Sequence, residues 1–195
     1  MSAPRKLISG LLTVGLMALA MWLYTFKPHL EDKEQDPLVT SGRAGAVVDN
    51  PDFSVKVGKI DVATGIAKSS FLQQKAQVMR SLGIFVIVHL EIKSNQKPFQ
   101  PGDPKLITRG GVSYDESGRA AISTPNGDFQ PMLWAPATYV FEIPKDRLAG
   151  ARLAIGESAL LIQLSAQTEV DLGLDNGEAA QLLSHASPAY ALKTT

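Results

Sequence analysis

The clearest hydrophobic pattern in the chain is the run GIFVIVHLEIK, residues 83–93. Its even-numbered positions are all aliphatic: Ile84, Val86, Val88, Leu90 and Ile92. From residue 85 on, its odd-numbered positions begin apolar and end polar: Phe85, Ile87, His89, Glu91 and Lys93. Because side chains alternate between the two faces of a strand, one face is buried throughout and the other only at its start. The pattern predicts a central strand of a two-sheet sandwich.

Short runs of β-branched and aromatic residues continue on both sides of this segment, broken by turn residues about every ten positions. The strands that they predict are 53–57, 59–63, 83–93, 105–108, 112–114, 120–123, 138–143, 152–155 and 159–166. Turn residues stand at 115–118 and 126–127, and the prolines between 98 and 104 mark a loop, since proline cannot donate to a strand ladder. About seven to nine strands in roughly 115 residues match an immunoglobulin-like antiparallel β-sandwich. We predict this mainly β fold for residues 50–174.

The amino end carries a continuous apolar run, Leu7–Phe26, of twenty residues without a charged side chain. At ~1.5 Å rise per residue, this length suits a hydrocarbon core of about 30 Å. Arg5 and Lys6 precede the run, and basic residues beside a membrane helix stay on the cytoplasmic side. We predict an N-terminal transmembrane helix over residues 7–26, with residues 1–6 in the cytoplasm. The protein is then a single-pass protein of the plasma membrane with an extracytoplasmic carboxyl-terminal domain.

A cleaved signal peptide is the main alternative interpretation of the same run, and a buried helix of a soluble protein is a weaker third. Ala18-Leu19-Ala20 fits an A-x-A cleavage site. The apolar run continues after it as MWLYTF, where a mature chain normally turns polar. The pattern therefore favours an uncleaved anchor over cleavage after Ala20.

Residues 27–49 are polar and contain few large apolar side chains. Such a segment buries too little surface to offset the entropy lost on ordering. We predict an extracellular stalk for residues 27–49, which connects the membrane helix to the sandwich.

A short helix and tail are predicted for residues 175–195. Asp175 is suited to cap this helix, with Glu178 three residues later as in a capping box. Ala179, Leu182 and Leu183 form an apolar stripe at helical spacing. A helix this short is marginal by itself. We expect it to dock on its own sandwich, with docking on a partner protein as the alternative.

Four segments carry a resemblance that extends over about residues 45–185: GIFVIVHLEIKSN, YDESGRA, YVFEIPKDRLAGARLAI and VDLGLD. The most specific piece is FEIPKDRLAGARLAI. Together they resemble the actinobacterial membrane-anchored proteins with an immunoglobulin-like extracellular domain of unknown function, of the "immunoprotective extracellular" type. The resemblance implies an accessory or surface protein. It supplies no catalytic or binding residue.

Composition excludes several classes of function. Nineteen Lys and Arg balance nineteen Asp and Glu, so no basic surface for nucleic acid is indicated. The absence of Cys excludes disulfides and thiolate metal sites. The chain has no G-x-S-x-G elbow, P-loop, H-E-x-x-H motif or dinucleotide fingerprint. We therefore predict no catalytic residue, no cofactor and no metal, and a protein that is not an enzyme.

Two sets of polar residues are candidates for catalysis or metal binding. His89 and Glu91 share the polar part of one strand face, where a solvated pair is favoured over a catalytic one. Four carboxylates fall in loops that Ca²⁺ could use: Asp103, Asp115, Glu116 and Asp128. Solvated turn carboxylates are favoured here, because no D-x-[DN]-x-[DN]-G run is present. An enzyme would require His89, Glu91 and these carboxylates to converge.

The segment QPMLWAPA offers the best candidate interaction surface, with Met132, Leu133 and Trp134. It is either an exposed apolar tip or a lid over the sandwich edge. Leu182 and Leu183 of the terminal helix complete the predicted interaction residues. We expect a non-enzymatic membrane protein that presents an accessory domain to protein partners, as a subunit of a larger membrane or envelope complex. The alternative is a binding module for a small envelope ligand or Ca²⁺ that uses the end loops of the sandwich.

Overall fold

The chain forms two compact units, residues 1–36 and residues 37–195. The computed structural model describes residues 13, 15–22, 37–68, 77–98, 100–120, 128–157 and 165–192. In the first unit, residue 13 and residues 15–22 are helical, and the remainder of the predicted membrane helix lies outside the described residues. Within the described part of the chain, no helix is both long enough and apolar enough to span a bilayer.

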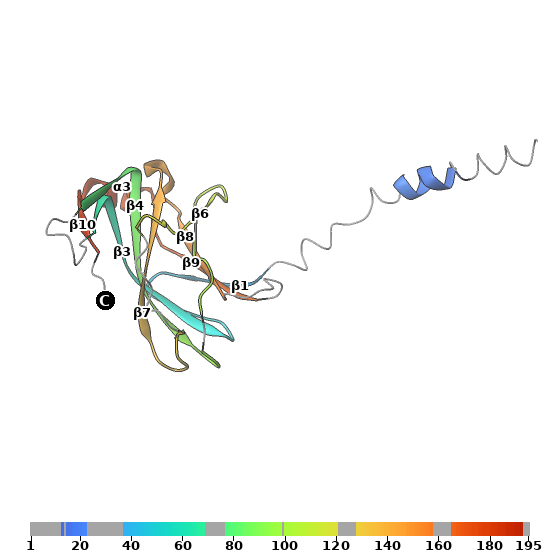
Figure 1. The fold of residues 1–195 in the computed structure, drawn as a ribbon, viewed down its shortest axis with the longest axis horizontal. Coiled ribbons are helices and arrows are strands. Elements are labelled where there is room, and N and C mark those ends of the chain that lie inside the picture. Colours follow the sequence, from blue (N-terminus) through green and yellow to red (C-terminus); the bar gives the residue numbers. More distant parts are fainter. Residues whose placement is uncertain are drawn as a thin grey trace, which may run out of the picture. The chain divides into compact units, whose positions relative to one another are not determined.

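The second unit is a sandwich of two sheets (Figure 1). The first sheet has the order β1 (Leu38–Arg43), β9 (Ala166–Asp171), β8 (Arg152–Gly156), β5 (Lys105–Ile107) and β6 (Ser113–Asp115). Strands β1 and β9 are parallel, and the other pairs are antiparallel.

The second sheet has the order β10 (Tyr190–Ala191), β3 (Phe53–Lys68), β4 (Gln77–Ser94) and β7 (Ala135–Ile143), and β2 (Val47–Asp49) also pairs with β3. Here β10 runs parallel to β3, and the remaining pairs are antiparallel. A short 3₁₀ helix, η1 (Lys145–Arg147), connects β7 to β8, and the helix α3 (Asn176–Ser184) follows β9. The prediction of a mainly β, two-sheet sandwich is confirmed, with two parallel pairs in place of a wholly antiparallel arrangement.

The central strand β4 has the predicted two faces. Its aliphatic residues at even positions from 84 to 92 are buried in the core between the sheets. On the other face, Phe85 and Ile87 belong to a second buried cluster, which Ala120 and the carboxyl-terminal segment around Tyr190 help to cover. From His89 on, this face is partly exposed. The change from apolar to polar at odd positions thus marks where the cover ends.

Most strand boundaries differ from the predictions by one or more residues, and three segments differ most. The predicted strands 53–57 and 59–63 are one strand, β3, whose register with β4 shifts between Val57 and Lys59. The last strand of the first sheet is Ala166–Asp171 rather than 159–166, of which 159–164 lie outside the described residues. Of the predicted strand 120–123, Ala120 lies in a turn and the rest is outside the described residues.

The predicted stalk, 27–49, requires a correction, because its second half belongs to the sandwich. Residues 27–36 lie outside the described part of the chain, but β1 and β2 occupy Leu38–Arg43 and Val47–Asp49. Most side chains of β1 are exposed, so the sequence has no alternation of apolar and polar residues that would predict this strand. Its order comes from backbone pairing with β9 along six positions, from Leu38–Ala166 to Arg43–Asp171.

The terminal helix forms as predicted. The Asp175 carboxylate accepts a hydrogen bond from the Glu178 N–H at 2.8 Å, and the Glu178 carboxylate accepts one from the Asp175 N–H at 3.3 Å. Ala179 is buried, and Leu182 and Leu183 pack partly buried against the core of the same sandwich. The intramolecular docking that we expected is therefore confirmed.

Candidate functional site

The segment before β7 presents three consecutive large apolar side chains to solvent. Met132 is 76% exposed, Leu133 61% and Trp134 36%. We call these three residues the apolar tip. Of the two alternatives that the sequence left open, an exposed tip and a lid, the structure shows the exposed tip.

The backbone holds this tip in an unusual conformation. Met132 has φ of 63°, and no other residue except glycine has positive φ among those that the structure describes. Its N–H donates a hydrogen bond to the Ser94 carbonyl at 2.9 Å, next to a β-bridge between Ser94 and Pro131. An L-residue in the left-handed region costs roughly 1–2 kcal/mol, and such strain persists where surrounding structure imposes it. The end of β4 thus fixes the turn that displays Met132 and Leu133.

The apolar tip carries a neighbouring positive charge. The Lys93 ammonium lies over the Trp134 ring, with Nζ 5.2 Å from the ring centre. This cation–π contact orients the indole while leaving about a third of the residue accessible. The apolar tip therefore exposes Met132, Leu133 and part of the Trp134 side chain.

The other two predicted interaction residues do not join this surface. Leu182 and Leu183 are on α3, which lies at the opposite end of the sandwich from the segment that enters β7 (Figure 1). Both side chains are half-buried against the core. The structure therefore separates the predicted interaction residues into two places, of which only the apolar tip is extensively exposed.

His89 is part of a polar cluster that sequence reasoning did not find. Its Nε2 lies 3.2 Å from Asp61 Oδ2 and 3.1 Å from the Tyr190 hydroxyl, and its Nδ1 lies 3.1 Å from Thr138 Oγ1. The Tyr190 hydroxyl also donates to Asp61 at 3.1 Å, and Lys59 pairs with Asp61 at 2.8 Å. The predicted neighbour Glu91 is exposed and faces Lys56 and Pro136 in the sheet register.

The polar cluster fastens the carboxyl-terminal strand to the sheet. Burial alone would raise the pKa of Asp61, but hydrogen bonds from Lys59 and Tyr190 hold it below its ordinary value. Burial and the negative charge of Asp61 raise the pKa of the Tyr190 phenol. A carboxylate and a neutral phenol are thus the stable forms, which is the arrangement that keeps the hydrogen bond between β10 and β3.

A second pair of polar side chains, Glu116 and Tyr139, lies near β6 and β7. Glu116 Oε1 and the Tyr139 hydroxyl are buried and have no hydrogen-bond partner among the described residues. Burial, together with the charge of Asp103, raises the pKa of Glu116 to about 7. Burial raises the pKa of Tyr139 as well, and the negative charge of Glu116 raises it further.

The predicted loop carboxylates do not form a metal site in the described part of the chain. Asp103 acts on Glu116 only through its charge, and Asp115 lies 4.0 Å from Lys105. Among the described residues, no three His, Asp or Glu side chains are grouped so that they would hold a metal ion.

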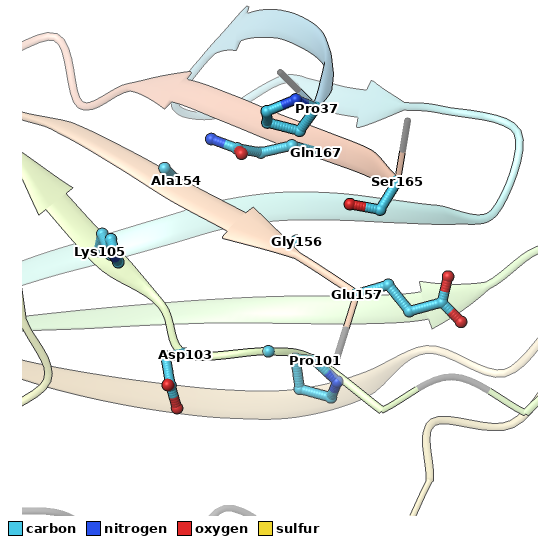
Figure 2. Close-up of a pocket in the computed structure, with 10 residues that line it drawn as sticks. Pro37, Pro101, Asp103, Lys105, Ala154, Gly156, Glu157, Ser165 and Gln167 are labelled. Atoms are coloured by element: carbon cyan, nitrogen blue, oxygen red, sulfur yellow. The ribbon is translucent and has the colours of Figure 1, made fainter. Parts of the chain in front are cut away.

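A polar pocket of about 460 Å³ lies against β8, β9 and β5 (Figure 2). Asp103, Lys105 and Glu157 are its charged residues. In Figure 2 the carboxylates of Asp103 and Glu157 point in different directions, and Glu157 pairs with Lys97 at 3.1 Å. Lys105 lies nearest to Asp115, which, like Lys97, is not part of the pocket lining.

No protein-family model and no curated protein sequence matches the chain. The chain is similar to several solved structures. One is an uncharacterized β-sandwich protein from Clostridium difficile, with a TM-score of 0.40 and 9% identity, covering 70% of this chain and 95% of that one. Another is the yjhA protein of Bacillus subtilis, with a TM-score of 0.47 and 9% identity, covering 67% of this chain and 99% of that one. A third is the secreted protein MPT63 of Mycobacterium tuberculosis, with a TM-score of 0.47 and 9% identity, covering 69% of this chain and 97% of that one. Membership of the family suggested by the sequence remains a prediction.

Proposed function

We propose that this protein is a non-enzymatic, single-pass membrane protein whose immunoglobulin-like sandwich stands outside the plasma membrane and binds another protein through the apolar tip. The anchor is the uncharged run 7–26, and Arg5 and Lys6 at its amino end favour a cytoplasmic amino terminus. The sandwich serves as a rigid support for the tip.

The observation that carries this proposal is the exposure of three adjacent large apolar residues on a strained turn. The exposed side chains of Met132 and Leu133 bury little apolar surface in the fold, and Met132 adds a backbone cost. Burial of such side chains at an interface returns about 25 cal/mol per Å² of apolar surface. Tryptophan and methionine are also enriched at the centres of protein interfaces. A binding role explains why the cost is retained.

The arrangement of the polar groups favours binding over catalysis. Both ring nitrogens of His89 are engaged, Nδ1 by Thr138 of β7 and Nε2 by Tyr190 of β10. Glu116, whose pKa is raised to about 7, has its buried oxygen near the buried Tyr139 phenol rather than in the polar pocket. An acid–base mechanism needs such groups within reach of one substrate position.

Capture of partners from gently solubilised membranes tests this proposal. The full chain is compared with the double variant Met132→Ser, Leu133→Ser, and the proteins that co-purify are identified by mass spectrometry. Val112→Ser, which alters an apolar residue that is 41% exposed elsewhere on the sandwich, is the matched control. We expect one protein partner to be lost from the double variant and kept by the control. Equal recovery from all three chains would refute the role of the tip.

A further inference from the structure

A cavity of about 670 Å³ lies between α3 and the strands that it covers. Its apolar wall is formed by Ile60 of β3, Leu172 and Leu174 of the segment after β9, and Leu182 of α3. Arg43, the last residue of β1, lies at the same cavity. Small-molecule sites are typically cavities of roughly 300–1,000 Å³ with an apolar lining and a few polar groups. The volume of this cavity lies in that range.

The walls of this cavity are held by contacts that do not depend on a ligand. Leu172 donates its N–H to the Ala151 carbonyl at 3.2 Å, and the Leu174 carbonyl accepts from the Gly150 N–H at 2.7 Å. On the other side, Ala179 is 4% exposed and anchors α3 to the core. The capping box fixes the first turn of the same helix. The site is therefore preformed.

Three ionisable side chains line the cavity: Arg43, Glu178 and His185. The carboxylates of Glu178 and of Asp171, the register partner of Arg43, are both hydrogen-bonded to backbone groups. Asp171 accepts the Gly173 N–H at 2.9 Å, and Glu178 accepts the Asp175 N–H at 3.3 Å. Among the described residues, no carboxylate oxygen lies within ion-pair distance of the Arg43 guanidinium. Arginine donates a planar pair of N–H groups that matches a carboxylate or phosphate.

We propose that this cavity binds a small anionic amphiphile, a carboxylate carried on a single short apolar chain. The head group pairs with Arg43, and the chain lies against Ile60, Leu172, Leu174 and Leu182. The Gln181 side chain on α3 supplies a further polar group at the cavity. This site is separate from the apolar tip, so the proposal stands independently of the partner-binding function.

Methyl-resolved NMR on the full chain, held in phosphatidylcholine nanodiscs, tests the proposal. Octanoate is titrated, with octanol as the uncharged probe of the same length. We expect saturable shifts of the Leu172, Leu174 and Leu182 methyl groups with octanoate. Because the readout is specific for these methyl groups, uptake of either probe into the lipid does not imitate binding.

Two variants decide between the contributions of charge and cavity. Arg43 is at an exposed position, and Arg43→Gln is expected to weaken the affinity for octanoate about tenfold, as expected for the loss of a charged hydrogen bond. The affinity for octanol should be unchanged. Leu182→Trp fills the cavity and is expected to abolish the shifts with both probes. The proposal is overturned if octanoate shifts none of these methyl groups, or if Arg43→Gln binds octanoate as tightly as the wild type.

Discussion

Lys93 and Trp134 are joined across the end of the sandwich, with the ammonium nitrogen 5.2 Å from the centre of the indole ring. Lys93 is the penultimate residue of β4, and Trp134 directly precedes β7. The contact therefore links the end of the central strand β4 to the exposed apolar tip.

The strain at Met132 makes the first prediction. Met132→Gly removes a left-handed conformation that costs an L-residue roughly 1–2 kcal/mol, and adds about 0.5–1 kcal/mol of unfolded-chain entropy. We expect an unfolding free energy equal to that of the wild type or up to about 1 kcal/mol higher, measured by urea denaturation. Leu133→Gly, at a position without positive φ, is the control and should be destabilised or unchanged. A loss of 1 kcal/mol or more in Met132→Gly would mean that the turn is not strained.

The register of β4 makes the second prediction. Val88 is fully buried between the sheets, whereas Glu91 is exposed. Val88→Asp places an unpaired charge in the core, at a cost of about 3 kcal/mol or more, and should abolish the cooperative unfolding transition. Glu91→Ala should change the unfolding free energy by less than about 0.5 kcal/mol. Similar effects of the two substitutions would contradict the register.

Docking of α3 makes the third prediction. Full burial of a leucine contributes about 1.5–3 kcal/mol, and Leu182 and Leu183 are half-buried. Replacing both with serine should lower the melting temperature of residues 37–195, followed by circular dichroism. Gln181→Ser, on an exposed position of the same helix, controls for helix propensity. An unchanged melting temperature in the double variant would show that the helix does not stabilise the sandwich.

The fourth prediction concerns pH and follows from the half-buried Glu116. The folded-state pKa is about 7, against an ordinary value of 4.5. A raised pKa means that stability from this group is fully present below about pH 4.5 and is lost as the pH rises through 7. Glu116→Gln cannot ionise, so it should be more stable than the wild type at pH 8 and about equal to it at pH 4.5.

The size of this effect is reduced by solvent screening, because Glu116 is only partly buried. We expect a rise in melting temperature of about 2–4 °C at pH 8, the change that about 1 kcal/mol produces in a domain of this size. Asp115→Asn removes an exposed neighbouring charge and is the matched control. A difference between Glu116→Gln and the wild type that is the same at both pH values would contradict the assignment.

Features that depend on neighbouring residues could be predicted from the sequence. The alternation in β4 follows from burial of one face, and the capping box at Asp175 and Glu178 lies within a single turn. The exposure of Met132, Leu133 and Trp134 was one of two alternatives. The sequence did not decide between them, because exposure depends on whether another segment covers the tip.

Features that depend on pairing between distant segments could not be predicted. β1 has mostly exposed side chains and is ordered by β9, as in the Val39–Gln167 pair, so it looks like a polar stalk. The partners of His89 come from other strands, and Tyr190 is 101 positions away along the chain. The cavity beneath α3 likewise forms only when the helix, β1 and β3 meet.

Site-specific photocrosslinking tests the central claim most directly, namely that the apolar tip binds a protein. A photoreactive phenylalanine derivative replaces Leu133 in the full chain, in the cells that make it, and replaces Val112 in a control chain. The account predicts one discrete protein adduct at position 133 that is absent at position 112. Irradiation that yields no protein adduct at position 133, or the same adducts at both positions, would contradict it.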